Sequence, residues 1–549
     1  MRNKTHRRPR ALIISAILLF VSAFAAFRSF PELRGQATSP AREKVEQPNV
    51  AAANPSFAPS VSNSASALEL GRQIDREIDE SEFAKARWGV FVMSLRDGRV
   101  LYARNADRTF APASNMKVYT TAVALDSLGA DYRWRTSVYA ESEPDGNGTL
   151  AGDLTLYGRG APDLSSSIDG GESKSSLAEL ADELYKRGVR RVRGDIVGDE
   201  SYFRGDPLGD GWLWNDVQWY FGAEVSALSI NDNEIEVVAT PSTKPDEVAS
   251  IKLKPETAYV QVKNDTNTAE RGAPPTIGIT RGLSDNQVRV WGDFPLGGRA
   301  LSARLSVHQP ALWAATLMRE ALKGRGITVE GVARSVDARE EEKGKKRIDP
   351  ARAVELASIR GKTLGEIIRS TNKESINLYA ELILRTLGKE RGESAPAADP
   401  KKMRTRGDDE AGLAVVRQWL EKHGIPTDAL ALHDGSGLSR LDLVTPEATA
   451  RLLAAVTQTP AARVFRDSLP IAGRDGTLKF RLRSVGADKI VAKTGTLTYI
   501  NSLSGYATTA DDEPLVFSII CNDETTAASS TRTIDAIAAL FASYTEPSQ

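Results

Sequence analysis

Three short motifs contain the residue types needed for nucleophilic attack on an acyl carbon. They stand in the order Ser114-Asn115-Met116-Lys117, Ser375-Ile376-Asn377 and Lys493-Thr494-Gly495. A serine and a lysine three positions apart on a helix share one face, so the lysine nitrogen can reach the hydroxyl oxygen. Burial and a second cation can lower the pKa of a lysine from about 10.4 and make it a proton acceptor. We therefore expect Ser114 to act as nucleophile, Lys117 as its base and Lys493 as the second cation.

Each motif alone is weak evidence for catalysis. Ser-x-x-Lys arises several times by chance in a chain of 549 residues and usually marks a solvated helix face. Ser-x-Asn is common at helix caps and turns. Lys-Thr-Gly is more specific here because it ends a β-rich run that begins at Lys489, and a glycine late in a strand lets a ligand backbone approach closely. The order and context of the three motifs together predict an acyl-transferring serine enzyme.

The first motif is expected at the start of a helix. The pattern predicts a helix over Met116–Leu128, directly after Ser114. Amide dipoles at a helix N-terminus favour developing negative charge, which suits a nucleophile that attacks a carbonyl group. An amphipathic helix over Leu68–Glu82 and a hairpin over Trp88–Ala103 should precede this site.

The other two motifs are expected on a helix and on a strand. Leu364–Leu387 has a helical pattern that includes the second motif, and another helix is expected over Ala311–Lys323. The C-terminal region predicts an antiparallel meander and a closing helix, at Lys489–Thr494, Leu503–Thr509, Leu515–Cys521 and Ser529–Tyr544. Helices from early and late in the chain would flank this sheet, and the first hairpin would complete it.

Residues 132–305 differ from both flanks, because they break into short alternating runs separated by glycine-containing turns. We interpret them as one or two inserted, mostly β domains. Such an insertion explains why the first two motifs are 261 positions apart. The catalytic domain would then be split over residues 66–131 and 306–549.

The motifs and their surroundings resemble the active-site serine penicillin-binding proteins. The similarity is to the low-molecular-mass class C group, the D-alanyl-D-alanine carboxypeptidases and endopeptidases of peptidoglycan, and covers about residues 70–545. The sequence around the second motif, Asn372–Glu381, also matches, as do three segments outside the motifs, Asp434–Arg440, Leu469–Thr477 and Val225–Asn233. The resemblance implies an α/β (α+β) class, the penicillin-binding-protein and β-lactamase-like transpeptidase fold, with helices flanking an antiparallel sheet.

The resemblance implies hydrolysis of peptidoglycan stem peptides and cross-links through an acyl-enzyme. Ser114 would attack the carbonyl of the penultimate D-alanine while Lys117 accepts its proton. Ser375 would relay a proton to the leaving amine, and Asn377 would position either the substrate amide or Lys117. A β-lactam would acylate the same serine, and no cofactor or metal is implied.

The third motif would bind the substrate rather than attack it. Lys493 and Thr494 would receive the terminal carboxylate through charge-assisted hydrogen bonds, with Gly495 beside them in the strand. The backbone amides of Ser114 and Thr496 would form the oxyanion hole by resemblance to the family.

A tryptophan-rich segment of the insertion, Trp212–Asp216, resembles a part of the family's second domain that lies near the active site. Asp216 would then bind the free amine of a dibasic residue in the stem peptide. Alternatively, Asp216 caps a turn beside two packed tryptophans, and the sequence leaves both hypotheses open.

Composition agrees with a large enzyme that recognises its substrate at a local site. The 71 basic and 72 acidic residues balance, so no global field recruits nucleic acid or an anionic surface. The length suggests about three domains with ample core. The single cysteine, Cys521, lies in an apolar strand pattern and is expected to be buried, which excludes a disulfide within the chain and a cysteine zinc cluster.

The N-terminus has the pattern of an export segment. Five basic residues within positions 1–10 precede the apolar run Ala11–Phe27, which contains a cleavage-like triplet, Ala23-Phe24-Ala25. Residues 1–27 are thus a signal peptide or a signal anchor, and 28–65 a flexible linker. We expect a periplasmic or cell-envelope location, with membrane anchoring left open.

Three other functions use related chemistry. A Ser-His-Asp hydrolase needs a histidine base, and none of the four histidines lies in a nucleophile-elbow setting. A β-lactamase shares the motifs, but no feature assures an added deacylation base. The main alternative is a catalytically weak penicillin-binding sensor or scaffold, and the intact motifs argue against it.

Overall fold

The computed structural model describes residues 62–165, 175–338, 347–392, 407–525 and 529–546. The signal segment predicted for residues 1–27 and nearly all of the predicted linker lie outside the described residues. Within the described ranges, no helix has the length and apolar character needed to cross a membrane.

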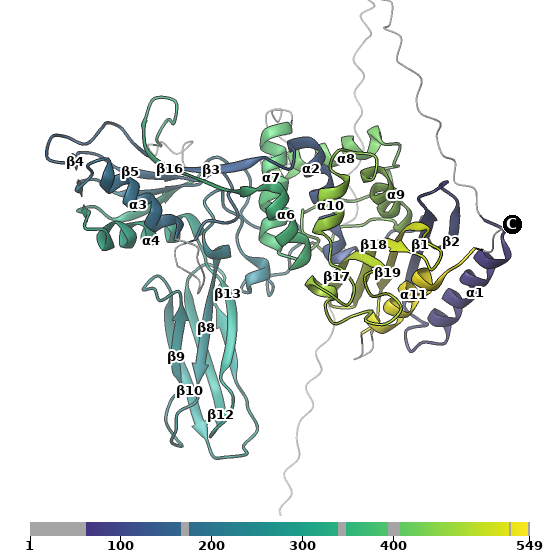
Figure 1. Ribbon diagram of the computed structural model, residues 1–549. Coiled ribbons are helices and arrows are strands. Elements are labelled where there is room, and N and C mark those ends of the chain that lie inside the picture. The colour runs from purple at the N-terminus through teal and green to yellow at the C-terminus, as the bar shows by residue number, and fades with distance from the viewer. Residues whose placement is uncertain (1–61, 166–174, 339–346, 393–406, 526–528, 547–549) are drawn as a thin grey trace, which may run out of the picture. The chain divides into compact units, whose positions relative to one another are not determined.

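A five-stranded antiparallel sheet contains strands from both ends of the chain, in the order β17-β18-β19-β1-β2 (Figure 1). The strands are β1 (Arg87–Ser94), β2 (Val100–Arg104), β17 (Ile490–Leu497), β18 (Ile500–Thr508) and β19 (Pro514–Asn522). β1 pairs with β19 along its whole length, from Arg87 opposite Asn522 to Ser94 opposite Leu515. The predicted meander and the hairpin that completes it are confirmed.

Helices cover both faces of this sheet, in places through an intervening helix. They are α1 (Ala65–Asp79), α2 (Met116–Leu128), α6 (Leu364–Lys373), α7 (Asn377–Arg391), α8 (Asp408–Lys422), α9 (Pro446–Val456), α10 (Ala462–Ser468) and α11 (Thr531–Ser543). α2 has the predicted bounds. The single helix expected over Leu364–Leu387 is instead two helices, which meet at the second motif.

The side chains of the sheet supply two apolar cores. Along β1, Val90 and Val92 pack with α1 and α11, whereas Phe91 and Met93 pack with α2 on the opposite face. A strand covered on both faces needs an almost unbroken apolar run, which explains why these strands were easy to recognise. Cys521 in β19 is buried as expected. An antiparallel sheet flanked by helices is the predicted fold class.

The inserted segment contains sheets of its own. Its strands up to residue 306 are β3 (Arg133–Ala140), β4 (Thr149–Leu150), β5 (Leu154–Tyr157), β6 (Arg191–Val192), β7 (Ile196–Asp199), β8 (Glu234–Thr240), β9 (Ser250–Lys254), β10 (Gln261–Ala269), β11 (Gly278–Arg281), β12 (Gln287–Pro295) and β13 (Leu301–Ser306). A helix, α3 (Ser176–Lys186), accompanies them. The expectation of a mostly β segment therefore agrees with these elements.

Elements that follow residue 305 pack with the insertion. They are α4 (Pro310–Gly324), β14 (Thr328–Val329), β15 (Ala333–Val336) and β16 (Val354–Thr363). β15 and β16 form the two edges of a sheet ordered β15-β7-β5-β3-β16, and Trp313 and Met318 of α4 belong to the same core as Leu180 of α3. We propose that the insertion runs from about 132 to 363, rather than ending at 305.

Candidate active site

Ser114 lies in a short 3-10 helix, η1 (Ala113–Asn115), that leads directly into α2. Lys117 is in the first turn of α2, and its Nζ donates a hydrogen bond to Ser114 Oγ at 3.0 Å. Ala113 has a φ of +49°, which is uncommon for a residue with a side chain. The two side chains are therefore in the contact that their three-residue spacing predicts.

The Lys117 amine is surrounded by acceptors and is 0% exposed. Its Nζ also donates to Asn377 Oδ1 at 2.6 Å and to the carbonyl oxygen of Ser436 at 2.7 Å. Burial lowers the pKa of Lys117 to about 7, against the opposing effect of nearby carboxylates. Burial, one of the two causes expected from the sequence, is thus the leading cause of the lowered pKa of Lys117.

The second motif lies at the junction of α6 and α7. Ser375 has a φ of +60°, which ends the helical path between the two helices. Asn377 begins α7, and its Nδ2 donates to the carbonyl oxygen of Phe221 at 2.8 Å. Asn377 therefore links Lys117 of the catalytic core to the inserted segment.

The third motif lies on β17, an edge strand of the sheet. Lys493 is 0% exposed and its Nζ donates to Ser375 Oγ at 2.8 Å and to the carbonyl oxygen of Thr494 at 2.8 Å. Burial lowers the pKa of Lys493 well below its ordinary value, and the proximity of Lys117 contributes further. Each buried lysine thus donates a hydrogen bond to one serine, Lys117 to Ser114 and Lys493 to Ser375.

β17 packs closely against the segment that carries Ser114, the predicted nucleophile. A side chain at Gly495 would have its Cβ 2.7 Å from the carbonyl oxygen of Pro112 and 3.1 Å from the backbone nitrogen of Ser114. One row of backbone groups on an edge strand faces away from its neighbour. Glycine is required here because it lets this free edge approach Ser114, as the sequence context suggested.

The loop Asp434–Arg440 supplies contacts that the sequence did not assign. The buried Asp434 carboxylate accepts hydrogen bonds from the backbone N–H groups of Gly437 at 2.6 Å and Ser439 at 2.8 Å. These bonds fix the loop so that the Ser436 carbonyl faces Lys117. The sequence of this segment resembles the family pattern, and that resemblance was the feature of the sequence that pointed to this loop.

A second buried carboxylate, Glu381 of α7, holds the same loop. Its Oε1 accepts hydrogen bonds from the N–H groups of Gly435 at 3.0 Å and Ser436 at 2.8 Å. Burial, with a contribution from the neighbouring Asp434, raises the pKa of Glu381 above its ordinary value. Two carboxyl groups thus hold the loop in place, that of Glu381 in α7 and that of Asp434 in the loop itself.

A cavity of about 690 Å³ opens in front of these groups. Ser114, Ser375, Asn377, Thr496 and Asp216 line it, so five of the predicted site residues share one space. Lys117 and Lys493 lie buried behind the serines that they contact. Thr494 is nearly buried, and its hydroxyl is within 2.7 Å of the Thr477 hydroxyl.

Asp216 and Arg440 face the same cavity. Asp216 Oδ2 and Arg440 Nε are buried, and neither has a hydrogen-bond partner among the described residues. Burial raises the pKa of Asp216, while the positive charge of Arg440 opposes this rise. Arg440 was part of a recognised segment but had no predicted role.

The fold and the paired serine–lysine contacts define the class of active-site serine penicillin-binding proteins. A model of the D-Ala-D-Ala carboxypeptidase 3 (S13) family matches residues 70–544. The D-alanyl-D-alanine carboxypeptidase of Actinomadura sp. is 35% identical over 466 residues, which are 83% of this chain and 81% of the relative. The D-alanyl-D-alanine carboxypeptidase DacB of Haemophilus influenzae is 25% identical over 433 residues, which are 78% and 84% of the two chains.

A solved structure has the same fold. The crystal structure of penicillin binding protein 4 (dacB) from Haemophilus influenzae matches with a TM-score of 0.70 and 24% identity, over 87% of this chain and 98% of that one. The protein therefore belongs to the D-Ala-D-Ala carboxypeptidase 3 family, and it is a serine-type D-Ala-D-Ala carboxypeptidase.

Proposed function

We propose that Ser114 carries the reaction through a covalent acyl-enzyme. Its Oγ attacks the carbonyl carbon of the penultimate D-alanine of a stem peptide, and the hydroxyl proton passes to Lys117 Nζ. The amide nitrogen leaves as the amine of the terminal D-alanine, and water then hydrolyses the ester. The observation that carries this proposal is the buried amine of Lys117, which lies 3.0 Å from Ser114 Oγ and has a pKa of about 7.

The leaving amine needs a proton when the C–N bond breaks. We assign this transfer to Ser375, whose Oγ accepts a hydrogen bond from Lys493 Nζ at 2.8 Å. The oxyanion of the tetrahedral intermediate would be held by the backbone N–H groups of Ser114 and Thr496. The close packing of η1 against β17 at Gly495 supports that pairing of amides.

Lys493 and Thr494 are assigned to the terminal carboxylate of the substrate. A bound carboxylate favours the charged form of a lysine, so substrate binding would offset the burial that lowers the pKa of Lys493. Asn377 orients Lys117 through its Oδ1 contact. A β-lactam would acylate Ser114 in place of the peptide, because its ring amide imitates the scissile bond.

The direct test uses the protein without residues 1–61, a pentapeptide muropeptide and a cross-linked muropeptide dimer. Product masses identify the bond that is cut, and Ser114→Ala serves as control. Loss of one alanine from the pentapeptide is expected, and cleavage of the dimer would add the endopeptidase activity that we also propose. Penicillin labelling of Ser114 without turnover of either substrate would favour the sensor or scaffold hypothesis instead.

We further propose that Asp216 and Arg440 recognise the third residue of the stem peptide. An acid and a base side by side in the cavity wall complement a residue that carries both a free amine and a carboxylate. Asp216→Ala should lower turnover of substrates with that amine more than of substrates without it. An equal loss on both would contradict the assignment.

The family acts on the bacterial cell wall, which is consistent with an envelope location for this protein. We propose that residues 1–27 direct its export and that the mature enzyme is periplasmic or envelope-bound. Separation of cell fractions, with and without residues 1–27, would distinguish a soluble from an anchored form.

A further inference from the structure

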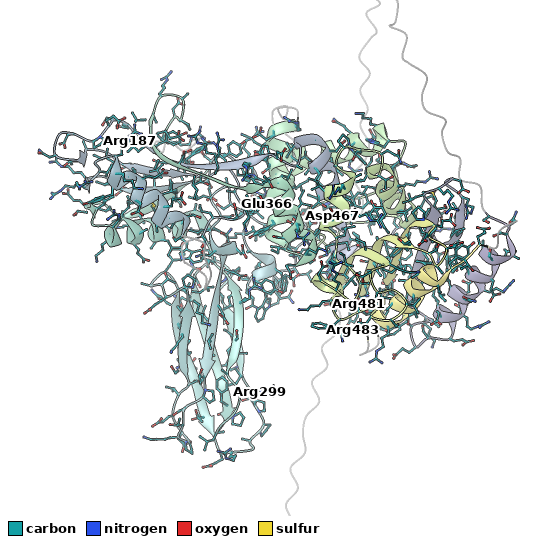
Figure 2. All side chains as sticks on the ribbon, in the orientation of Figure 1. Arg187, Arg299, Glu366, Asp467, Arg481 and Arg483 are labelled. Atoms are coloured by element: carbon teal, nitrogen blue, oxygen red, sulfur yellow. The ribbon has the colours of Figure 1, made fainter. Side chains whose placement is uncertain are left out.

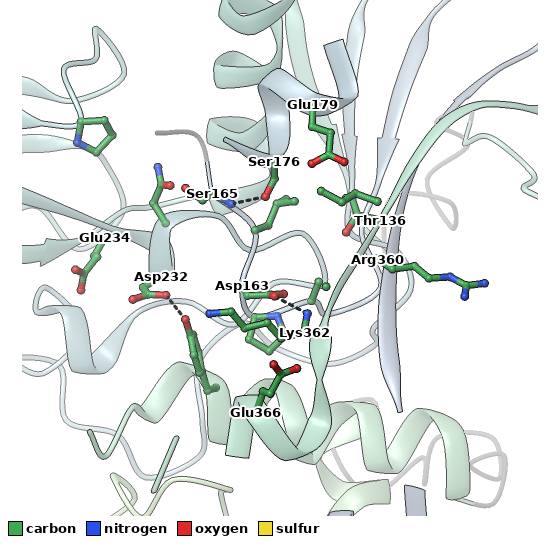
Figure 3. A pocket seen from close by; sticks show the side chains of 18 of the residues that line it. Thr136, Asp163, Ser165, Ser176, Glu179, Asp232, Glu234, Arg360, Lys362 and Glu366 are labelled. Carbon is green, nitrogen blue, oxygen red and sulfur yellow. Dashed lines mark hydrogen bonds between the residues drawn. The ribbon is translucent and has the colours of Figure 1, made fainter. Parts of the chain in front are cut away.

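A second cavity adjoins the active-site cavity and has part of its wall in common. This side cavity has a volume of about 1010 Å³ and lies between the inserted segment, α6 and α7 (Figure 3). Three residues, Asp232, Glu234 and Arg304, line both cavities. The two spaces therefore share one wall, to which these three residues contribute.

An ion pair and a cation–π contact, both made by Arg304, hold the shared wall in place. Arg304 donates two hydrogen bonds to the carboxylate of Glu234, at 2.6 and 2.7 Å. The Arg304 guanidinium also lies 4.1 Å from the centroid of the Tyr220 ring, which belongs to the active-site cavity. Two independent contacts thus hold Arg304 at the junction.

A turn forms the rest of the junction. Asn231, Asp232 and Asn233 have φ values of +48°, +54° and +52°, although none of them is glycine. Asn and Asp adopt this left-handed conformation more readily than other residues that have a side chain, and three in succession form a compact turn.

The surroundings of this turn explain how it is held. Asn233 is 0% exposed, and its Nδ2 donates to the carbonyl oxygen of Glu224 and to Ser229 Oγ, both at 2.9 Å. The Asp232 carboxylate accepts a hydrogen bond at 2.9 Å from the hydroxyl of Tyr379, which lies in the first turn of α7. The turn is the end of the segment Val225–Asn233, which matched the family pattern without a predicted role.

The side cavity presents both signs of charge to a ligand. Lys362 and Glu179 stand on different walls, from the end of β16 and the first turn of α3 (Figure 3). Among the described residues, the Lys362 ammonium group makes no hydrogen bond, although its charge interacts with the carboxylate of Glu366 in the same cavity (Figures 2 and 3). The Glu179 carboxylate has no hydrogen bond or ion pair within the described residues. Opposite charges on separate walls suit a peptide that carries carboxylates and an amine, and they disfavour a polyanion.

The volumes indicate how many peptides can bind. A pocket of about 300–1,000 Å³ ordinarily holds one small ligand, and the active-site cavity alone falls in that range. The side cavity offers at least as much space again. We propose that the side cavity binds the second stem peptide of a cross-linked peptidoglycan dimer while the first lies at Ser114. This inference rests on the proposed function and adds a site that selects cross-linked substrate.

The first test measures binding without turnover, in a Ser114→Ala background, by titration calorimetry. We expect the cross-linked dimer to bind at least tenfold more tightly than the uncross-linked pentapeptide muropeptide. Lys362→Gln should weaken binding of the dimer about tenfold, because a charge-assisted contact is lost. The affinity for the pentapeptide should be unchanged. Glu179→Gln should also weaken binding of the dimer, because it removes a charge from a different wall of the side cavity.

Lys323→Gln is the matched control, since Lys323 is an exposed lysine of α4 that lines neither cavity. It should bind both ligands as the Ser114→Ala parent does. Equal affinity of the parent for dimer and pentapeptide would overturn the inference. So would a Lys362→Gln variant whose affinity falls equally for both ligands, or for neither.

A second test measures turnover with Ser114 intact. Lys362→Gln should lower kcat/KM for the dimer about tenfold, with pentapeptide hydrolysis unchanged. Pentapeptide cleavage by the wild type, without preferential dimer binding, overturns the side-cavity inference alone. An inert wild type overturns the proposed function, and the binding experiment still decides the inference.

Discussion

Lys117 combines two properties that a general base in a serine enzyme needs. Its nitrogen lies 3.0 Å from the Oγ of Ser114, the proposed nucleophile, and burial lowers the pKa of Lys117 to about 7. An ordinary lysine with a pKa of about 10.4 would be almost fully protonated at neutral pH and could not accept a proton. In the proposed mechanism, the burial of Lys117 therefore decides whether Ser114 is reactive.

This residue predicts how acylation depends on pH. The neutral fraction of Lys117 rises as pH increases through about 7, so the rate of Ser114 acylation by a fluorescent penicillin should rise over the same range and then level off. Stopped-flow or gel-based labelling between pH 5 and 9 would measure it. An inflection near pH 10, or a flat profile, would contradict the assignment of Lys117 as the base.

Removal of the amine gives a second prediction at this scale. Lys117→Ala should lower the acylation rate by about 10²- to 10⁴-fold, which is the usual contribution of a general base. The pre-steady-state rate with a penicillin measures the chemical step directly. Normal turnover by this variant would exclude the proposed proton route, and Lys85→Ala, a change at an exposed position outside the site, should have no effect.

The loop Asp434–Arg440 and η1 are two elements in direct backbone contact. Gly437 has a φ of +80°, and a Cβ at this position would overlap the carbonyl oxygen of Ala113. Gly437→Ala should displace η1 and reduce Ser114 acylation at least tenfold, because small misplacements of reacting groups are costly. Gly424 has a φ of +70° with open space around it. Gly424→Ala should therefore cost only about 1 kcal/mol of stability and leave acylation intact.

The packing of α11 on the sheet gives a stability prediction. Phe517 of β19 and Phe541 of α11 are both 0% exposed, with ring centroids 5.2 Å apart. Phe517→Ala should lower the free energy of unfolding by about 3–5 kcal/mol, because it leaves a cavity in this core. Phe480 is 73% exposed, so Phe480→Ala should change the unfolding free energy by less than about 0.5 kcal/mol. Chemical denaturation of the two variants would measure the difference.

At the scale of the whole molecule, the catalytic part and the insertion have separate apolar cores. The core of the insertion draws all its buried residues from positions 138–357, whereas α1, α2, α7 and α11 belong to other cores. A smaller cluster joins them, in which Phe203 and Val225 pack against Leu378 and Leu382 of α7. The insertion thus contacts the helix that begins with Asn377.

Separate cores predict that the insertion folds alone. A polypeptide of residues 132–363 should show cooperative thermal unfolding by circular dichroism, because it contains its own core and complete sheets. The shorter polypeptide 132–305 lacks α4, β15 and β16 and should lack a cooperative transition. A cooperative transition in the shorter polypeptide would favour the boundary at 305.

The sequence determined the chemistry and most of the local structure of the catalytic part. The three-residue spacing of Ser114 and Lys117 on a helix fixes their contact through local geometry. The strands β1, β18 and β19 were predictable because burial on both faces requires an unbroken apolar run. Recognisable segments such as Asp434–Arg440 could be found without a role being assigned to them.

Tertiary structure alone decided how distant segments meet. The Lys117 pKa depends on burial by groups up to 319 positions away, as its bond to the Ser436 carbonyl shows. Ser375, at the break between α6 and α7, accepts a hydrogen bond from Lys493, and no local pattern reports that contact. The packing of α4 with the insertion and the junction at Arg304 likewise depend on contacts between elements. Local patterns encode helices, strands and spacing, whereas desolvation and cavity walls arise only when the chain has folded.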